Sequence, residues 1–306
     1  MQEVREQVPL KPQTTFEIGG SARYFVDVCS ESEIGEAIAW ARDKSVPFVV
    51  LGGGSNVLVP DSGIDGLVIH IVGDLYGAEK GALDAWAGCN LLFLIRTLGA
   101  QGYGGWEKLA GIPGTIGGAV RGNAGAFGPE IRDFVEKVRA LNSETGEYRD
   151  FVNPDCNFSY RHSFFKDHPE WVITVVQVKL AQRSHGDIDM SIRDTIAERE
   201  KRHLQNVRAA GSFFMNPKVP QNIIDTFEKE KGVKSREGRV PAGWLIEKAG
   251  MKGATVGGAI ASLQHPNYIV NMGNATAEDV RSLAAMVKES VKKQFGVELQ
   301  EEAAIM

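Results

Sequence analysis

The stretch GIPGTIGGAVRGNAGAFG, residues 111–128, constrains the fold of this chain most, because seven of its eighteen residues are glycine and none is acidic. Each glycine in an ordered element costs about 0.5–1 kcal/mol relative to alanine, so several together indicate that something approaches the main chain closely. Three interpretations compete: a flexible linker, a series of structural turns, and a surface where a ligand contacts bare N–H groups. Linkers are richer in serine and poorer in isoleucine, and successive N–H groups form anion-binding concavities, so ligand binding is favoured.

A second glycine-rich turn, LGGGSNVLVPDSGIDGLVI (51–69), lies between two predicted strands, where a phosphate or pyrophosphate could bind. The standard nucleotide fingerprints are missing, since no G-x-G-x-x-G opens a helix after a strand and no G-x-x-x-x-G-K-[ST] is present. The motifs H-E-x-x-H and G-x-S-x-G are also absent, and the six histidines are scattered. We therefore expect neither a Rossmann nor a P-loop site, and no metal. His265, before Pro266, is interpreted as a polar loop residue.

The hydrophobic pattern predicts α+β domains in succession, with boundaries near 73 and near 185–205. Strands are expected at 22–28, 47–51, 66–71, 82–88 and 171–181, in a hairpin near 134–152, near 268–271 and, briefly, after Gly296. A Ser30/Glu33 capping box and Asn90 are expected to begin helices, and Thr276 and Gly296 to delimit the last one. Other helices are expected at 187–206, 221–231 and 241–249.

Composition excludes several function classes. The chain has 306 residues, 43% of them hydrophobic, a net charge of −5 and no run of like charges, which argues against nucleic acid or an anionic membrane surface as a partner. We find no signal-peptide core and no apolar run long enough to span a membrane. The three cysteines, Cys29, Cys89 and Cys156, form no C-x-x-C pair, so a disulfide framework is not expected and a reducing cytoplasm is.

Three further stretches have the character of chemical sites. Arg161 lies among aromatic residues in NFSYRHSFFK, where a buried guanidinium would need an anion, although it could simply stack on Tyr160 or Phe158 at the surface. Ser212 follows a glycine in RAAGSFFMNP and could equally be a turn or N-cap residue. The paired acids of VELQEE could be no more than a solvated tail.

These stretches occur in a fixed order with TTFEIGGSA (14–22) and PAGWLIEKAGMKG (241–253). In that order they resemble the UDP-N-acetylenolpyruvoylglucosamine reductase (UDP-N-acetylmuramate dehydrogenase) family of cell-wall precursor synthesis, over about residues 14–302. The resemblance implies a two-part FAD-binding region similar to the vanillyl-alcohol-oxidase (PCMH-type) fold, with subdomains at 1–73 and 74–186. It also implies an α+β substrate domain at 187–296 and a strand at 297–306 that returns to the first subdomain.

The resemblance implies that NADPH reduces bound FAD, which then reduces the enolpyruvyl ether of a UDP-N-acetylglucosamine substrate. Arg161 matches the family's cation beside the substrate carboxylate, Ser212 its proton donor and Glu302 its C-terminal acid, for which we expect a raised pKa. Residues matching the family's substrate contacts are Tyr160, Asn216 and Lys252. Residues matching its FAD contacts are Gly52, Gly53, Gly54, Ser55, Asn56, Gly111, Ile112, Gly114, Thr115, Gly117, Gly118, Asn123 and Gly125.

The chain departs from the family pattern at two places. The family usually ends L-E-P-E-V, whereas this tail reads LQEEAAIM, so Glu301 could replace Glu302 as the acid. The interval from Arg161 to Ser212 lacks the added tyrosine loop of some members, which places the chain in the short-loop type. We expect a cytoplasmic monomer. Two alternatives stay open: a flavin oxidase of the same fold, and a non-enzymatic nucleotide-binding module.

Overall fold

The computed structural model describes residues 2–201 and 207–306, and these form two compact units. The first unit comprises residues 2–8, 22–54 and 64–201. The second comprises residues 9–21 and 55–63 together with the described residues from 207 onwards. The predicted division of the first 186 residues into two subdomains stays a prediction, as does the boundary of the substrate domain.

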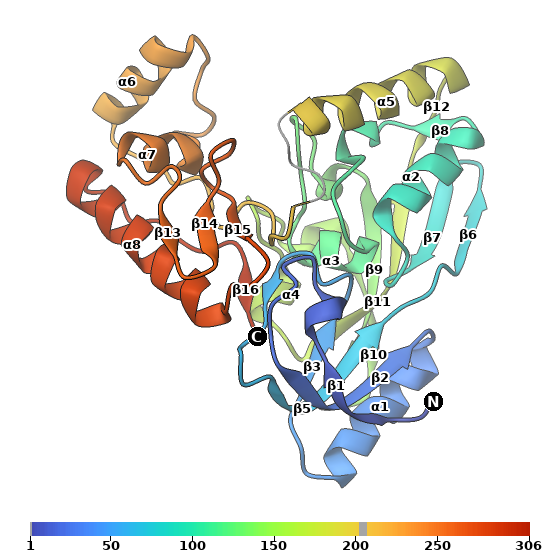
Figure 1. The fold of residues 1–306 in the computed structure, drawn as a ribbon. Coiled ribbons are helices and arrows are strands. Elements are labelled where there is room, and N and C mark those ends of the chain that lie inside the picture. Colours follow the sequence, from blue (N-terminus) through green and yellow to red (C-terminus); the bar gives the residue numbers. More distant parts are fainter. Residues whose placement is uncertain (1, 202–206) are drawn as a thin grey trace. The chain divides into compact units, whose positions relative to one another are not determined.

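The first sheet of unit 1 is built from a β-α-β start, as the pattern predicts (Figure 1). Strands β2 (Ser21–Val28) and β3 (Phe48–Leu51) both pair in parallel with β5 (Ile64–Ile71), and β1 (Arg5–Pro9) extends the edge beside β2. Helix α1 (Glu31–Asp43) connects β2 to β3 and buries its apolar face, which includes Ile34 and Ile38. Glycine-rich residues follow directly where β3 ends.

Helix α1 begins as predicted at Ser30, but only half of the expected capping box forms. The Ser30 hydroxyl accepts a hydrogen bond from Glu33 N at 3.3 Å. The Glu33 carboxylate accepts from Cys29 N at 2.7 Å, one residue before the cap. This hydrogen bond lowers the pKa of Glu33. The reciprocal contact of a full box, to the N–H of the cap residue itself, is therefore replaced by one to its predecessor.

The second sheet of unit 1 is antiparallel, in the order β10-β9-β11-β7-β6. Its strands are β6 (Tyr76–Glu79), β7 (Ala82–Trp86), β9 (Val135–Asn142), β10 (Tyr148–Val152) and β11 (Trp171–Lys179). Strands β8 (Tyr103–Gly104) and β12 (Ala181–Gln182) form a separate pair. The helices that accompany this sheet are α2 (Leu91–Ala100), α3 (Ile116–Arg121), α4 (Phe164–Asp167) and α5 (His185–Lys201).

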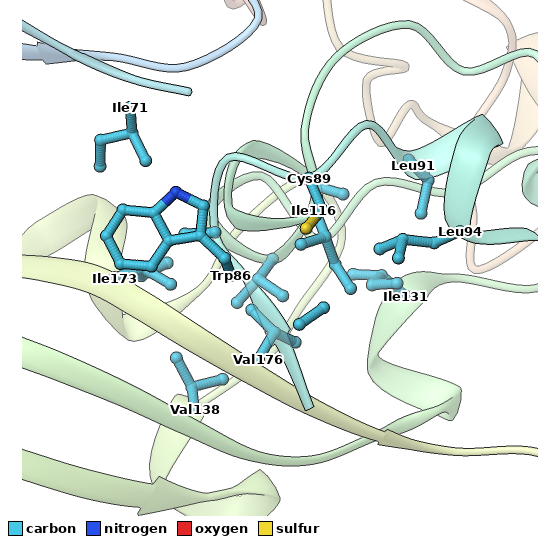
Figure 2. Close-up of a cluster of buried hydrophobic side chains, with 14 of the residues drawn as sticks. Ile71, Trp86, Cys89, Leu91, Leu94, Ile116, Ile131, Val138, Ile173 and Val176 are labelled. Atoms are coloured by element: carbon cyan, nitrogen blue, oxygen red, sulfur yellow. The ribbon is translucent and has the colours of Figure 1, made fainter. Parts of the chain in front are cut away.

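A continuous core lies against this sheet and under the glycine-rich stretch (Figure 2). Ile116 from α3 lies among Cys89, Leu91 and Leu94, whose segment begins α2. Val138 and Val176 come from the neighbouring strands β9 and β11 and are fully buried. Because Ile116 is fully buried, the segment 114–118 is fixed to this core by a large apolar side chain.

Unit 2 contains a small antiparallel sheet, β13-β14-β15, together with α6, α7 and α8 (Figure 1). Helix α8 buries Val280, Leu283, Val287 and Val291 as one stripe, begins at Thr276 and ends at Gly296 with φ +67°. A parallel pair links Val57 with Ala304. The bounds are β4 (Val57–Leu58), α6 (Gln221–Lys231), α7 (Ala242–Lys248), β13 (Thr255–Val256), β14 (Ala259–Ala261), β15 (Ile269–Asn271), α8 (Ala277–Phe295) and β16 (Ala304–Ile305).

The prediction of a strand directly after Gly296 is wrong. Residues 297–300 form no strand, and the pairing at this end of the chain is the two-residue β16 and an isolated bridge between Phe214 and Glu301. The last five residues of the helix predicted over 187–206 fall on 202–206, outside the described residues. No helix of the described ranges is long and apolar enough to cross a membrane.

Candidate active site

The two glycine-rich stretches meet main chain to main chain within unit 1. A Cβ added at Gly53 would lie 2.7 Å from the Cα of Gly114, and one added at Gly52 would lie 2.9 Å from the Thr115 hydroxyl. Both distances are well under ordinary carbon contact, so any side chain at Gly53 would push the loops apart. The sequence pattern singled out each loop; the structure shows that they form one feature.

The first loop keeps main-chain donors available beside the second. Among residues 2–201 and 207–306, no protein acceptor takes the N–H groups of Gly52, Gly53 or Gly54. Gly54 is buried and has φ +60°, a conformation that favours glycine. Buried main-chain donors are nearly always paired, so the N–H of the buried Gly54 indicates a ligand with acceptor oxygens.

Other members of the second stretch shape the loop from inside. A Cβ at Gly117 would lie 2.7 Å from that of Ala87, so this glycine allows α3 to pack closely on the segment after β7. The Thr115 hydroxyl accepts from Gly118 N and caps α3. Asn123 is fully buried, and its amide donates to Glu130 and to the carbonyl of Ser159. The side chain of Asn123 is therefore engaged within the protein.

Arg161 reaches the glycine-rich stretch from a two-residue hairpin turn. Ser159 and His162 exchange main-chain hydrogen bonds, which places Arg161 at the second central position, with φ +56°. Positive φ at that position is normally met by glycine, and a non-glycine residue held there at a cost is typical of functional sites. One guanidinium nitrogen donates to the Gly125 carbonyl at 3.0 Å. The guanidinium also lies 5.4 Å from the ring of Tyr160.

Ser212 lines an open pocket of about 440 Å³ in unit 2. Asn216 lines the same pocket, as do the aromatic Trp244 and the basic Lys231. His265, interpreted from sequence as a loop residue, is a further lining residue. A pocket with a hydroxyl, an amide, a cation and an aromatic wall suits a polar ligand of intermediate size.

The segment after Ser212 also contacts the C-terminal acids. Glu302 N donates to the carbonyl of Phe213 at 2.8 Å, so Ser212 and Glu302 belong to neighbouring main-chain segments of one unit. Glu301 forms a bridge with Phe214 and pairs with Lys288 of α8 at 3.3 Å. The Glu301 carboxylate is therefore engaged with α8.

The other residues predicted to contact substrate or cofactor have hydrogen-bond partners within the protein. Asn216 accepts from Ala242 N at 2.9 Å and so caps α7. Lys252 pairs at 2.8 Å with Glu247, a residue that lines the Ser212 pocket, and this hydrogen bond lowers the pKa of Glu247. Asn56, expected to contact the cofactor, donates to the main chain of Glu302 at 3.1 Å. Ser55 and Asn56 belong to unit 2, whereas Gly52, Gly53 and Gly54 belong to unit 1.

Comparison with known proteins connects these features to a family. Residues 202–306 match the family model described as UDP-N-acetylenolpyruvoylglucosamine reductase, C-terminal domain, and residues 22–151 match that of the FAD binding domain. The UDP-N-acetylenolpyruvoylglucosamine reductase of Solibacter usitatus is 35% identical over 310 residues, covering 98% of this chain and 95% of the relative. The chain belongs to the UDP-N-acetylenolpyruvoylglucosamine reductase family.

Two more members of that reductase family match this chain over nearly its whole length. The Pseudomonas putida protein of that name is 35% identical over 333 residues, covering 97% of each chain. The crystal structure of UDP-N-acetylenolpyruvylglucosamine reductase from Thermus caldophilus is 31% identical, with a TM-score of 0.76, and covers 99% of this chain and 98% of that one. The predicted α+β fold, with an FAD-binding domain of the PCMH type and a C-terminal domain, is confirmed, and the chain is an FAD-dependent oxidoreductase.

The structure of this family member fits FAD at the two loops. Gly53 and Gly114 meet without side chains, so the main chain is open to a ligand there. The N–H groups of Gly52, Gly53 and Gly54 beside this contact suit the oxygens of a pyrophosphate. Sequence reasoning missed Asn267, which contacts the segment after Ser212 through its side chain. No local signal marks it, because an asparagine after a proline is an ordinary turn residue.

Proposed function

We propose that this chain catalyses the NADPH-dependent reduction of UDP-N-acetylglucosamine enolpyruvate to UDP-N-acetylmuramate, a step of peptidoglycan precursor synthesis. FAD held at the two glycine-rich loops would supply the hydride chemistry that links NADPH to the β-carbon of the enolpyruvyl group. The protein's own task is to orient the substrate, to stabilise charge as it develops and to deliver one proton. The proposal extends the family assignment to individual residues.

One observation carries the residue assignment: Arg161 occupies a strained turn position and directs its guanidinium to the carbonyl of Gly125 in the glycine-rich stretch. Hydride addition to the β-carbon moves negative charge into the substrate carboxylate. A guanidinium fork matches a carboxylate in two parallel hydrogen bonds, which an ammonium group does not reproduce. Stabilising charge that develops only in the transition state lowers the activation free energy of the reaction by several kcal/mol.

Ser212 supplies the proton for the α-carbon in this proposal. A hydroxyl donates while remaining neutral at pH 7, and Ser212 lines a pocket large enough to admit a polar ligand. Glu302 acts beside the substrate carboxylate in its protonated form, because a bare anion there would oppose the developing charge. Glu302, and not Glu301, takes this role, since Glu301 is ion-paired with Lys288.

Asn216, Lys252 and Tyr160 contact the substrate in this proposal. Asn216 lines the Ser212 pocket, and Lys252 reaches its rim through Glu247. Tyr160 shares the hairpin turn with Arg161. The chain acts as a short-loop member of its family, as a monomer and in the cytoplasm. The interval between Arg161 and Ser212 supports the short-loop assignment, and the three free cysteines support a reducing compartment.

The two half-reactions test the assignment of Ser212. Flavin absorbance is followed anaerobically in wild type and in Ser212→Ala, first with NADPH and then with the enolpyruvyl substrate. We expect the variant to be reduced by NADPH at the wild-type rate and to be reoxidised by substrate about 100-fold more slowly, since a lost proton donor costs ~10²–10⁴ in rate. Equal loss in both halves would show that Ser212 supports the fold instead.

A further inference from the structure

Asn267 makes a two-point contact with the main chain next to Ser212. The asparagine is 3% exposed. Its amide nitrogen donates to the carbonyl of Phe214 at 2.8 Å, and its amide oxygen accepts from Phe214 N at 3.0 Å. Its own main-chain carbonyl accepts from Phe213 N at 2.7 Å. The N–H of Phe213 and both main-chain groups of Phe214 are thus held by one residue.

The side chain of Asn267 acts here as a strand neighbour would. Residues 265–268 form a turn in which Tyr268 N donates to the carbonyl of His265 at 2.8 Å, with Pro266 at its first central position. Proline has no N–H, so the main chain at this turn cannot continue a ladder along the segment 213–214. The amide side chain supplies one donor and one acceptor, which is what the missing ladder would have provided.

The other side of the same segment carries the C-terminal residues. The Phe213 carbonyl accepts from Glu302 N at 2.8 Å, and Met215 N donates to the carbonyl of Gln300 at 2.9 Å. The side chains of Phe213 and Phe214 are each only 1% exposed, so the segment is also fixed by packing. Residues 213–215 therefore lie between Asn267 and the tail that carries Glu302.

We propose that Asn267 is a positioning residue for the reaction, and that it holds the Ser212 hydroxyl in place through the main chain of Phe213 and Phe214. This inference rests on the proposed role of Ser212. Asn267 and Ser212 both line the same pocket. A displacement of about 1 Å in a reacting group can lower the rate ~100-fold. Loss of the Asn267 hydrogen bonds next to the proton donor should therefore change the reoxidation rate measurably.

Asn271 provides a matched control four residues further on. It is also 3% exposed, and its amide makes hydrogen bonds to Phe16 and Glu17 main-chain carbonyls and to the N–H groups of Gly273 and Ala275. None of these partners belongs to residues 212–216. Asn271→Ala therefore removes a comparable buried amide from the same unit without touching the segment that carries Ser212.

The test is a double-mutant cycle on the two half-reactions, with Asn267→Ala, Ser212→Ala and the double variant. Asn267→Ala is expected to keep NADPH-dependent flavin reduction within about twofold and to slow reoxidation by the enolpyruvyl substrate ~10-fold or more, at saturating substrate. The double variant should be no slower than Ser212→Ala, because residues acting through one group are not additive. Asn271→Ala should lower the unfolding midpoint and leave both half-reactions within about twofold.

Three outcomes would overturn the proposal: a wild-type reoxidation rate in Asn267→Ala, equal slowing of both half-reactions, or additive effects in the double variant. If Asn267→Ala does not fold, Asn267→Asp serves in its place, since it keeps the size and the acceptor for Phe214 N but places a carboxylate oxygen, in place of the amide donor, against the Phe214 carbonyl. Wild-type enzyme that is not reoxidised by the enolpyruvyl substrate would refute the proposed function itself, a result distinct from all three.

Discussion

Gly53→Ala tests the contact between the two glycine-rich loops. The added Cβ would lie 2.7 Å from the Gly114 Cα, which is about 1 Å inside the ordinary carbon contact distance of ~3.5–4.0 Å. The clash is with main chain, so no side chain can rotate away from it. Gly53 does not have positive φ, so the effect of the substitution is steric and carries no backbone strain.

The magnitude follows from the cost of overpacking. Inserting a methyl group into a close contact costs about 1–3 kcal/mol. Without ligand the loops can part and relieve the clash, but FAD bound to both loops would draw them together again, so the cost falls on cofactor affinity. At 1.4 kcal/mol per factor of ten, the Kd for FAD should rise about 5- to 140-fold.

The assay is titration of apo-protein with FAD, followed by quenching of flavin fluorescence, with thermal unfolding of the apo-protein as the companion measurement. Gly35→Ala is the matched control, because a Cβ there meets nothing within 4 Å and the residue lies in helix α1 of the same unit. The control should bind FAD as wild type does. A Gly53→Ala protein with a Kd within about twofold of this control would show that the contact of Gly53 with Gly114 does not limit FAD binding, since even 1 kcal/mol corresponds to about fivefold.

Three further predictions concern other parts of the structure. Asn123→Ala removes a fully buried amide that donates to Glu130 and to the carbonyl of Ser159, and should destabilise the protein by about 1–3 kcal/mol in urea unfolding; an unchanged midpoint would contradict its placement. The pKa of Asp279 is lowered by hydrogen bonds from Thr276 N and Gly258 N, so its contribution to stability is present above the unfolded pKa of about 3.9 and lost as pH falls through the folded one. Asp279→Asn should accordingly lower the free energy of unfolding at pH 7 and match wild type in strong acid. A difference in this free energy that does not change with pH would contradict the lowered pKa of Asp279. Burial raises the pKa of Cys89 to about 11 and that of Cys156 to about 12. Iodoacetamide near neutral pH should therefore label the native protein only at the exposed Cys29, as checked by mass spectrometry. Early labelling of a second cysteine would contradict the burial of these two thiols.

The sequence predicts best those elements whose signals are local. Helix α8 has a capping threonine, four apolar residues at helical spacing and a terminal glycine, all within its own length. Strands β4 and β16 have two residues each, and their pairing depends on partners at opposite ends of the chain. The strand predicted directly after Gly296 does not form at residues 297–300, because the local sequence does not specify the partner that a strand needs.

In the candidate site too, the sequence predicts features with local signals and misses those that depend on distant partners. Composition and order singled out both glycine-rich loops and the stretches that carry Arg161, Ser212 and Glu302. The contact of Gly53 with Gly114 could not be predicted, because it depends on how two distant loops pack. The positive φ of Arg161 is likewise invisible in sequence, since the turn is defined by the pairing of Ser159 with His162. Asn267 and Phe214 are 53 residues apart, so no local pattern could link them.

Anaerobic mixing tests whether this chain passes a hydride from NADPH through FAD to the enolpyruvyl substrate. Purified wild-type protein with FAD bound is mixed with NADPH, and the enolpyruvyl substrate is then added without oxygen while flavin absorbance and product are followed together. We expect bleaching by NADPH, recovery on adding substrate, and one UDP-N-acetylmuramate formed per flavin reoxidised. Recovery that requires oxygen and yields no such product would contradict this hydride transfer and support a flavin oxidase, and a protein that cannot be loaded with FAD would contradict it altogether.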